Sequence, residues 1–79
     1  MIQPSILIFG NSRVAARRRA EHEGLNRSDW RFIGDDIQIR RYRGGALWAM
    51  PDRLHNKFWP RVFERAIAQN MSLIYKDSL

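Results

Sequence analysis

The sequence predicts a single α/β domain, residues 1–79, built on a four-stranded parallel sheet. A chain of 79 residues is long enough for one domain with a small core. Ile6–Phe9 and Ala46–Met50 are short, unbroken apolar runs, and such runs are typical of strands buried on both faces of a parallel sheet. Segments with helix caps and helical spacing separate the runs, which indicates alternating strands and helices.

The first strand, Ile6–Phe9, leads directly into a helix. In the Gly10-Asn11-Ser12 segment the glycine permits a sharp exit, and a polar side chain can accept a hydrogen bond from the free N–H groups of a helix. The helix is predicted over Arg13–Glu23, with Gly24 at its C-terminal cap. Its apolar residues are small, so the helix can lie close to the sheet.

The second strand is predicted at Trp30–Ile33, and the connection that follows it, Asp35–Gly45, has two interpretations. In the first, Ile37–Ile39 is a strand and Gly44-Gly45 is the turn of an antiparallel hairpin. In the second, the connection holds a short helical turn and crosses over to a third parallel strand, Ala46–Met50. We favour the crossover because the flanking strands are unbroken apolar runs rather than alternating ones.

The last third of the chain completes a second strand–helix–strand unit. Pro51 ends the third strand, and a loop or irregular helical entry leads to Pro60, which suits the first position of a helix. Asn70 can close this helix in the left-handed conformation before a final strand, Met71–Tyr75. We expect right-handed crossovers and a parallel sheet of strand order 2-1-3-4 with two main helices.

The predicted strand order places one candidate site. The chain reverses direction between the first and third strands, and open α/β sheets bind ligands outside the carboxyl ends of the strands at such a reversal. The residues expected there as anion ligands are Asn11, Ser12, Arg13 and Arg53. In the alternative interpretation Asn11 and Ser12 only cap the helix, while Asp52 and Arg53 pair with each other in solvent.

Charge and aromatic residues predict a second kind of site. The formal net charge is +6, and twelve of the fourteen cationic residues are arginines, which favours polyanionic partners. A GC-rich genome would produce the same bias. The candidate interaction surface consists of Arg40, Arg41, Tyr42, Arg43, Phe58 and Trp59. Of the last two rings, we expect at least one to stay substantially exposed; the alternative is that both fold inward.

Several classes of chemistry lack their motifs. The chain has no cysteine, which excludes disulfides and zinc–thiolate sites, and it has no glycine-rich phosphate motif of the dinucleotide-binding or NTPase kind. His22 and His55 lie far apart in sequence, and Ser12 lacks the setting of a hydrolase nucleophile. We therefore expect no enzymatic activity, no cofactor and no metal. With no long apolar run, we expect a cytoplasmic protein that does not enter membranes.

The pattern resembles small Rossmann-like proteins of unknown function from phages of high-GC actinobacteria. The resemblance is carried by Ile6–Gly10, Ala20–Leu25, Asp29–Ile33 and Tyr42–Gly45. It implies a minimal Rossmann-like domain and a small accessory protein that acts on host or phage machinery, in the host cytoplasm if a phage encodes it. We expect a non-enzymatic binding protein whose partner is a host protein. The alternative is a protein that binds nucleic acid or a nucleotide at the N-terminus of the first helix. A homodimer is compatible with both.

Overall fold

A computed structural model describes residues 4–77 and contains four strands, two α-helices and two short 3₁₀ helices. In chain order these are β1 (Ile6–Phe9), α1 (Arg13–His22), β2 (Trp30–Ile33), η1 (Gln38–Arg41), β3 (Ala46–Ala49), η2 (Pro51–His55), α2 (Trp59–Ala68) and β4 (Ser72–Tyr75). None of the helices within residues 4–77 is long and apolar enough to cross a membrane.

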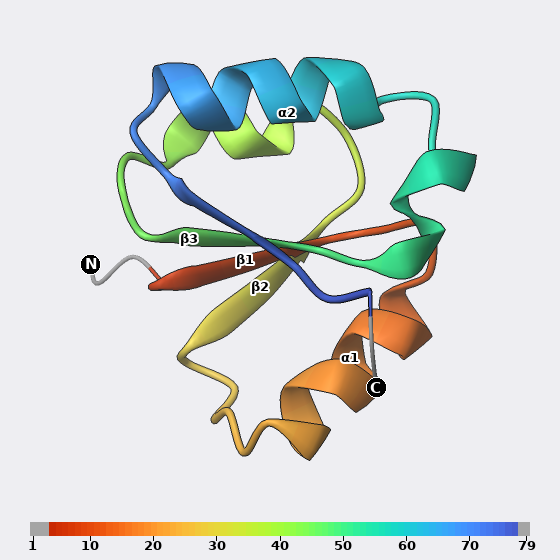
Figure 1. Cartoon of the computed structure of the whole chain (residues 1–79). Helices are drawn as coiled ribbons and strands as arrows, with labels where there is room; N and C mark the ends of the chain where they lie inside the picture. The colour runs from red at the N-terminus through yellow and green to blue at the C-terminus, as the bar shows by residue number, and fades with distance from the viewer. Residues whose placement is uncertain (1–3, 78–79) are drawn as a thin grey trace.

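The four strands form one parallel sheet in the order β2-β1-β3-β4, as predicted (Figure 1). In its register Ile8 lies between Phe32 on β2 and Trp48 on β3. The segment from Asp35 to Gly45 is a crossover that contains η1, so the hairpin interpretation is wrong. β1 lies inside the sheet with a paired strand on each edge, which suits a strand whose two faces are both buried.

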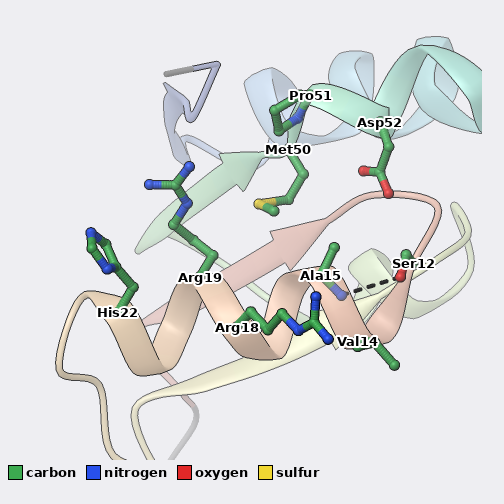
Figure 2. Close-up of a pocket in the computed structure, with 9 residues that line it drawn as sticks. All are labelled: Ser12, Val14, Ala15, Arg18, Arg19, His22, Met50, Pro51 and Asp52. Carbon is green, nitrogen blue, oxygen red and sulfur yellow. Dashed lines mark hydrogen bonds between the residues drawn. The ribbon is translucent and has the colours of Figure 1, made fainter. Parts of the chain in front are cut away.

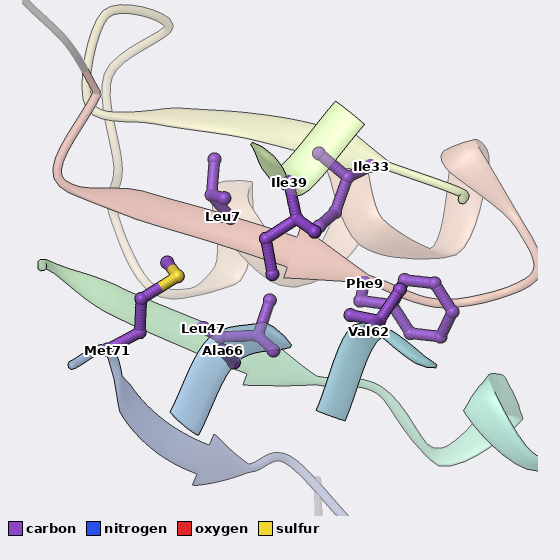
Figure 3. Close-up of a cluster of buried hydrophobic side chains, with 8 residues drawn as sticks. All are labelled: Leu7, Phe9, Ile33, Ile39, Leu47, Val62, Ala66 and Met71. Carbon is purple, nitrogen blue, oxygen red and sulfur yellow. The ribbon is translucent and has the colours of Figure 1, made fainter. Parts of the chain in front are cut away.

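Each face of the sheet has its own buried cluster. The face covered by α2 and η1 is centred on β1 and β3 (Figure 3), and its buried residues are Leu7, Phe9, Ile33, Ile39, Leu47, Val62, Ala66 and Met71. The face covered by α1 is smaller, and its buried residues are Ile8, Ala16, Ala20, Trp48 and Met50. The two buried alanines of α1 let the helix backbone approach the sheet closely, as expected from its small apolar residues.

The helix ends follow the predicted caps with small shifts. Ser12 is the N-cap of α1, which ends at His22, one residue earlier than predicted, and Gly24 has a φ of 75°. α2 begins at Trp59, with Pro60 in its first turn. Asn70 has a φ of 58°, so it closes α2 in the left-handed conformation as expected.

Candidate functional site

The segments that follow β1 and β3 meet at the carboxyl edge of the sheet, as the strand order predicts. One oxygen of Asp52 lies so close to Gly10 that a Cβ on the glycine would collide with it. This oxygen, Oδ1, is buried and has no hydrogen-bond partner. Asn56 joins the ends of β1 and β2, because its Nδ2 donates to the carbonyls of Gly10 (3.1 Å) and Gly34 (3.0 Å). The edge is therefore a tightly held junction.

At this junction Ser12 acts as a helix cap. Its Oγ accepts a hydrogen bond from the N–H of Ala15 at 3.1 Å. The carboxylate of Asp52 follows β3 at the same edge and lies against the start of the Gly10–Ser12 turn, which disfavours a second anion there. Asn11 is exposed, as is Arg13, whose guanidinium carbon lies 5.6 Å from the centre of the Phe32 ring. Arg13 is thus directed along the β2 side of α1.

Arg53, the fourth predicted anion ligand, forms its contacts with other residues of the chain. Its Nη1 lies 2.6 Å from Oδ1 of Asp77 and donates to the carbonyl of Met50. Its guanidinium carbon lies 4.7 Å from the ring centre of Tyr75 and 5.5 Å from that of Trp59. The structure therefore does not assemble the four predicted residues around one anion, and Arg53 pairs with Asp77 rather than with its neighbour Asp52.

The arginine cluster at the end of η1 is also arranged differently from the prediction. Tyr42 is partly buried and packs against the core of the α2 face. Arg43 turns back, and its Nη1 donates to the carbonyls of Arg40 (3.0 Å) and Tyr42 (3.1 Å). Arg40 and Arg41 are exposed, but Arg40 lines a pocket of mixed charge that also contains Asp36. This cluster is not a uniform basic surface.

The expectation of a substantially exposed ring at Phe58 or Trp59 is wrong. Both side chains are partly buried against the core of the α2 face. Trp59 stacks on Phe9 with ring centres 5.6 Å apart and contacts Phe63 edge-on at the same distance. The physical reason is that α2 begins at Trp59, where the ring can pack on Phe9 at the carboxyl end of β1. The alternative, that both rings fold inward, describes the structure.

A different basic surface lies along the β2 side of α1. We call it the arginine groove; it has a volume of about 390 Å³ and is lined by Arg13, Arg17, Arg27, Arg31, Trp30, Phe32 and Gln38. No acidic side chain is among its lining residues in the part of the chain that the structure describes. The four arginines are all exposed, and the two aromatic rings between them are partly buried. The groove therefore combines concentrated positive charge with aromatic surface.

The four arginines of the groove come from three segments that are separate in sequence. Arg13 and Arg17 are four residues apart and lie on one flank of α1, Arg27 precedes β2, and Arg31 is on that strand. Because β2 pairs with β1 and α1 connects them, the helix flank and the edge strand are brought side by side. Sequence reasoning missed this surface, although the four-residue spacing on α1 and the Trp-Arg-Phe pattern of β2 were available signals.

Two further questions are whether the chain could bind a metal ion and which known proteins it is similar to. No group of three or more His, Cys, Asp or Glu side chains within residues 4–77 is placed to hold a metal ion. Comparisons with models of protein families, with curated proteins and with solved structures found no match. The arginine groove, lined by four exposed arginines, is taken as the candidate site.

Proposed function

We propose that this protein is a non-enzymatic binding protein that holds the phosphate backbone of single-stranded nucleic acid in the arginine groove. The observation that carries the proposal is that four exposed arginines line a groove without an acidic lining residue among the described residues. Guanidinium groups match phosphate oxygens in two-point hydrogen bonds and keep their charge at all physiological pH values. A net charge of +6 adds long-range attraction for a polyanion.

The arginines of the groove are available for phosphates. Arg17 is near Glu21, but the closest atoms are 3.8 Å apart and both side chains are 66% exposed, so this pair contributes little. Arg13 lies over the ring of Phe32, and cation–π contact of this kind holds a guanidinium in place without neutralising its charge. The groove can thus exchange solvent for phosphate oxygens without first breaking strong ion pairs.

The aromatic residues favour a single strand over a free phosphate or a nucleotide. Trp30 and Phe32 are alternate residues of β2, partly buried under α1 and still lining the groove. Unstacked bases pack on such rings while the backbone follows the positive charge, and this mode tolerates many base sequences. Binding through this groove is therefore expected to depend strongly on salt and weakly on base sequence.

The test measures the affinity of a fluorescent single-stranded oligonucleotide at several salt concentrations. Neutralising four phosphates gives a slope of about −3 in a plot of log affinity against log salt, and each lost contact reduces it by about 0.7. Arg13→Gln and Arg31→Gln should each weaken binding and flatten the slope. Arg41→Gln, which also removes one exposed arginine but outside the groove, should change neither.

Two results would contradict the proposal. One is tight binding that is insensitive to Arg13→Gln and Arg31→Gln, which would place the nucleic acid elsewhere on the chain. The other is an absence of oligonucleotide binding together with binding of an acidic polypeptide such as polyglutamate, which would make the groove a site for an acidic protein. A duplex competitor of the same sequence should displace the single strand poorly.

A further inference from the structure

β4 is an edge strand, and no strand within residues 4–77 pairs with its outer side. Figure 1 shows it in blue, in front of β3 at the end of the sheet. The N–H groups of Ser72 and Lys76 donate to the β3 side, over 2.8 and 2.9 Å. Because successive strand residues alternate in direction, Leu73 and Tyr75 turn their N–H and C=O groups away from β3. The free edge thus offers two donors and two acceptors.

The two edge strands of the sheet differ in charge. β2, at the other end, carries the exposed Arg31, and a charged side chain within an edge strand discourages pairing with another chain. β4 has no charged residue between Ser72 and Tyr75. Two of its apolar side chains are exposed, Ile74 by 39% and Tyr75 by 48%. β4 is therefore the edge that is open to strand pairing.

The cations beside β4 are paired within the chain. Lys76 contacts Glu23 at 3.2 Å, and Arg53 contacts Asp77 at 2.6 Å. Arg19, which extends from α1 toward the sheet (Figure 2), also contacts Glu23. The arginine groove lies beside β2, at the opposite end of the sheet. A second copy of this chain, with the same net charge of +6, therefore meets less repulsion at β4 than at β2.

We infer that β4 pairs with β4 of a second copy in antiparallel orientation, about a two-fold axis that passes beside Ile74. In this register Leu73 faces Tyr75 of the second copy, and the two residues exchange two N–H···O=C hydrogen bonds. The symmetry repeats this pair on the other side of the axis. All the donors and acceptors that Leu73 and Tyr75 direct outward are then satisfied, and the two four-stranded sheets become one.

The side chains of β4 are self-complementary in this register. Ile74, next to Trp48 on the α1 side of the sheet, faces Ile74 of the second copy. Leu73 and Tyr75, which lie on the α2 side, face each other across the two copies. Apolar side chains that lie directly opposite each other pack closely across an antiparallel pair. Lys76 faces the uncharged Ser72, so the register contains no pair of like charges.

Neighbouring registers use the edge less well. An axis at Leu73 pairs Tyr75 with Met71, whose N–H already donates to the carbonyl of Ala66 over 3.0 Å. An axis at Tyr75 instead places the charged Asp77 opposite the apolar Leu73. A pair of four-residue strands covers less than the about 800 Å² per partner of a standard interface, so we expect a dissociation constant in the micromolar range.

The first experiment is disulfide trapping, which is simple because the chain has no cysteine of its own. Ile74→Cys places one thiol of each copy at the axis, in a pair whose Cα atoms are about 4.5 Å apart and within the range for a disulfide. The matched control is Ser72→Cys, an exposed position of the same strand and the same face. The register separates its two thiols by about 13 Å along the strand, so only Ile74→Cys should form a covalent dimer under mild oxidation.

The second experiment is sedimentation equilibrium of the full chain, with circular dichroism to check the fold of each variant. Ile74→Lys brings two ammonium groups together and should raise the dissociation constant of the dimer at least about tenfold (~1.4 kcal/mol). Ile37→Lys makes the same change at a 66% exposed position of the crossover after β2 and should leave the constant unchanged. Added salt should strengthen the dimer by screening the two net charges, whereas it weakens contacts with phosphates.

Three outcomes would overturn the inference. The first is a wild-type chain that stays monomeric at millimolar concentration, which would leave the edge to a strand of another protein. The second is a dimer that Ile74→Lys does not weaken, because the contact would then lie on another surface. The third is equal disulfide formation by Ser72→Cys and Ile74→Cys, which would indicate random collision. The trapping result decides the question if Ile74→Lys does not fold.

Discussion

The indole of Trp59 stacks on the ring of Phe9, with ring centres 5.6 Å apart and planes inclined by 28°. The same indole contacts Tyr75 edge-on at 6.4 Å and lies beneath the guanidinium of Arg53. Trp59 thus links the start of α2 to the carboxyl ends of β1 and β4. It is a structural residue, and the candidate binding surfaces lie elsewhere.

Replacing Trp59 with alanine should therefore lower the free energy of unfolding by about 3 kcal/mol. This value is at the lower end of the range for truncating a buried aromatic side chain, because the Trp59 ring is only partly buried. Trp59→Phe keeps a ring against Phe9 and should lose much less. Urea denaturation followed by circular dichroism measures both. A loss within about 0.5 kcal/mol for Trp59→Ala, as at ordinary surface positions, would show that the stack does not stabilise the fold.

The ion pair between Arg53 and Asp77 should contribute measurably to stability. Its N···O distance is 2.6 Å, and the two side chains are 12% and 57% exposed, so solvent screens it in part. A double-mutant cycle with Arg53→Met and Asp77→Asn should give a coupling of about 0.5–1 kcal/mol. The Arg17–Glu21 pair, longer and more exposed, is the matched control and should give a coupling near zero. Equal couplings in the two cycles would refute this difference.

Glu23 should make stability depend on pH in the acidic range. A hydrogen bond from Lys76, 3.2 Å away, lowers the pKa of Glu23 below its ordinary value of 4.5, and the charges of Lys76 and Arg19 act in the same direction. A carboxyl whose pKa is lower in the folded state stabilises the fold above its unfolded pKa. That contribution is lost as the pH falls through the folded pKa.

The measurement compares wild type with Glu23→Gln by chemical denaturation between neutral pH and pH 3. The stability difference in favour of wild type should shrink as the pH falls, because protonation removes the charge that the variant already lacks. In Lys76→Met, an NMR titration should show the pKa of Glu23 moving up toward its ordinary value. An unchanged pKa in that variant would mean that Lys76 is not the cause of the shift.

Gly44 and Gly45 provide a test of the tight entry into β3. Both have positive φ, 67° and 75°, but their surroundings differ. A Cβ at Gly44 would meet nothing within 4 Å, whereas one at Gly45 would lie 2.8 Å from the backbone oxygen of Ser5. Gly44→Ala should cost about 1–2 kcal/mol from the left-handed backbone alone, and Gly45→Ala clearly more. Thermal denaturation of the two variants measures the difference, and equal losses would contradict the clash.

Most of the fold could be predicted because its signals are local. Ile6–Phe9 identified a strand buried on both faces, and Ser12 and Asn70 marked the ends of helices at the places where the structure has them. The unbroken apolar runs also favoured the crossover over the hairpin at Asp35–Gly45, which the structure confirms. Each of these decisions depends on a few neighbouring residues and on the backbone conformations that they allow.

Side-chain direction could not be predicted in the same way. Arg53 was expected beside Arg13, but its position depends on Asp77 and on the ring of Tyr75, which the chain supplies twenty or more residues later. Tyr42 was expected among arginines at the surface, yet its position next to α2 buries it in part. Long side chains choose among many directions of similar energy, so contacts distant in sequence decide where they lie.

The local pattern of apolar runs, glycines and caps was thus sufficient for the strands and the parallel sheet, whereas the strand order was an assumption that the structure confirms. The arginine groove arose only when Arg13 and Arg17 of α1 came beside Arg27 and Arg31 at the edge of the sheet. Secondary structure follows from interactions within a few residues, whereas a binding surface forms where charged residues from distant segments come together. Here the pairing of β2 with β1 and the packing of α1 against β2 decide which arginines become neighbours.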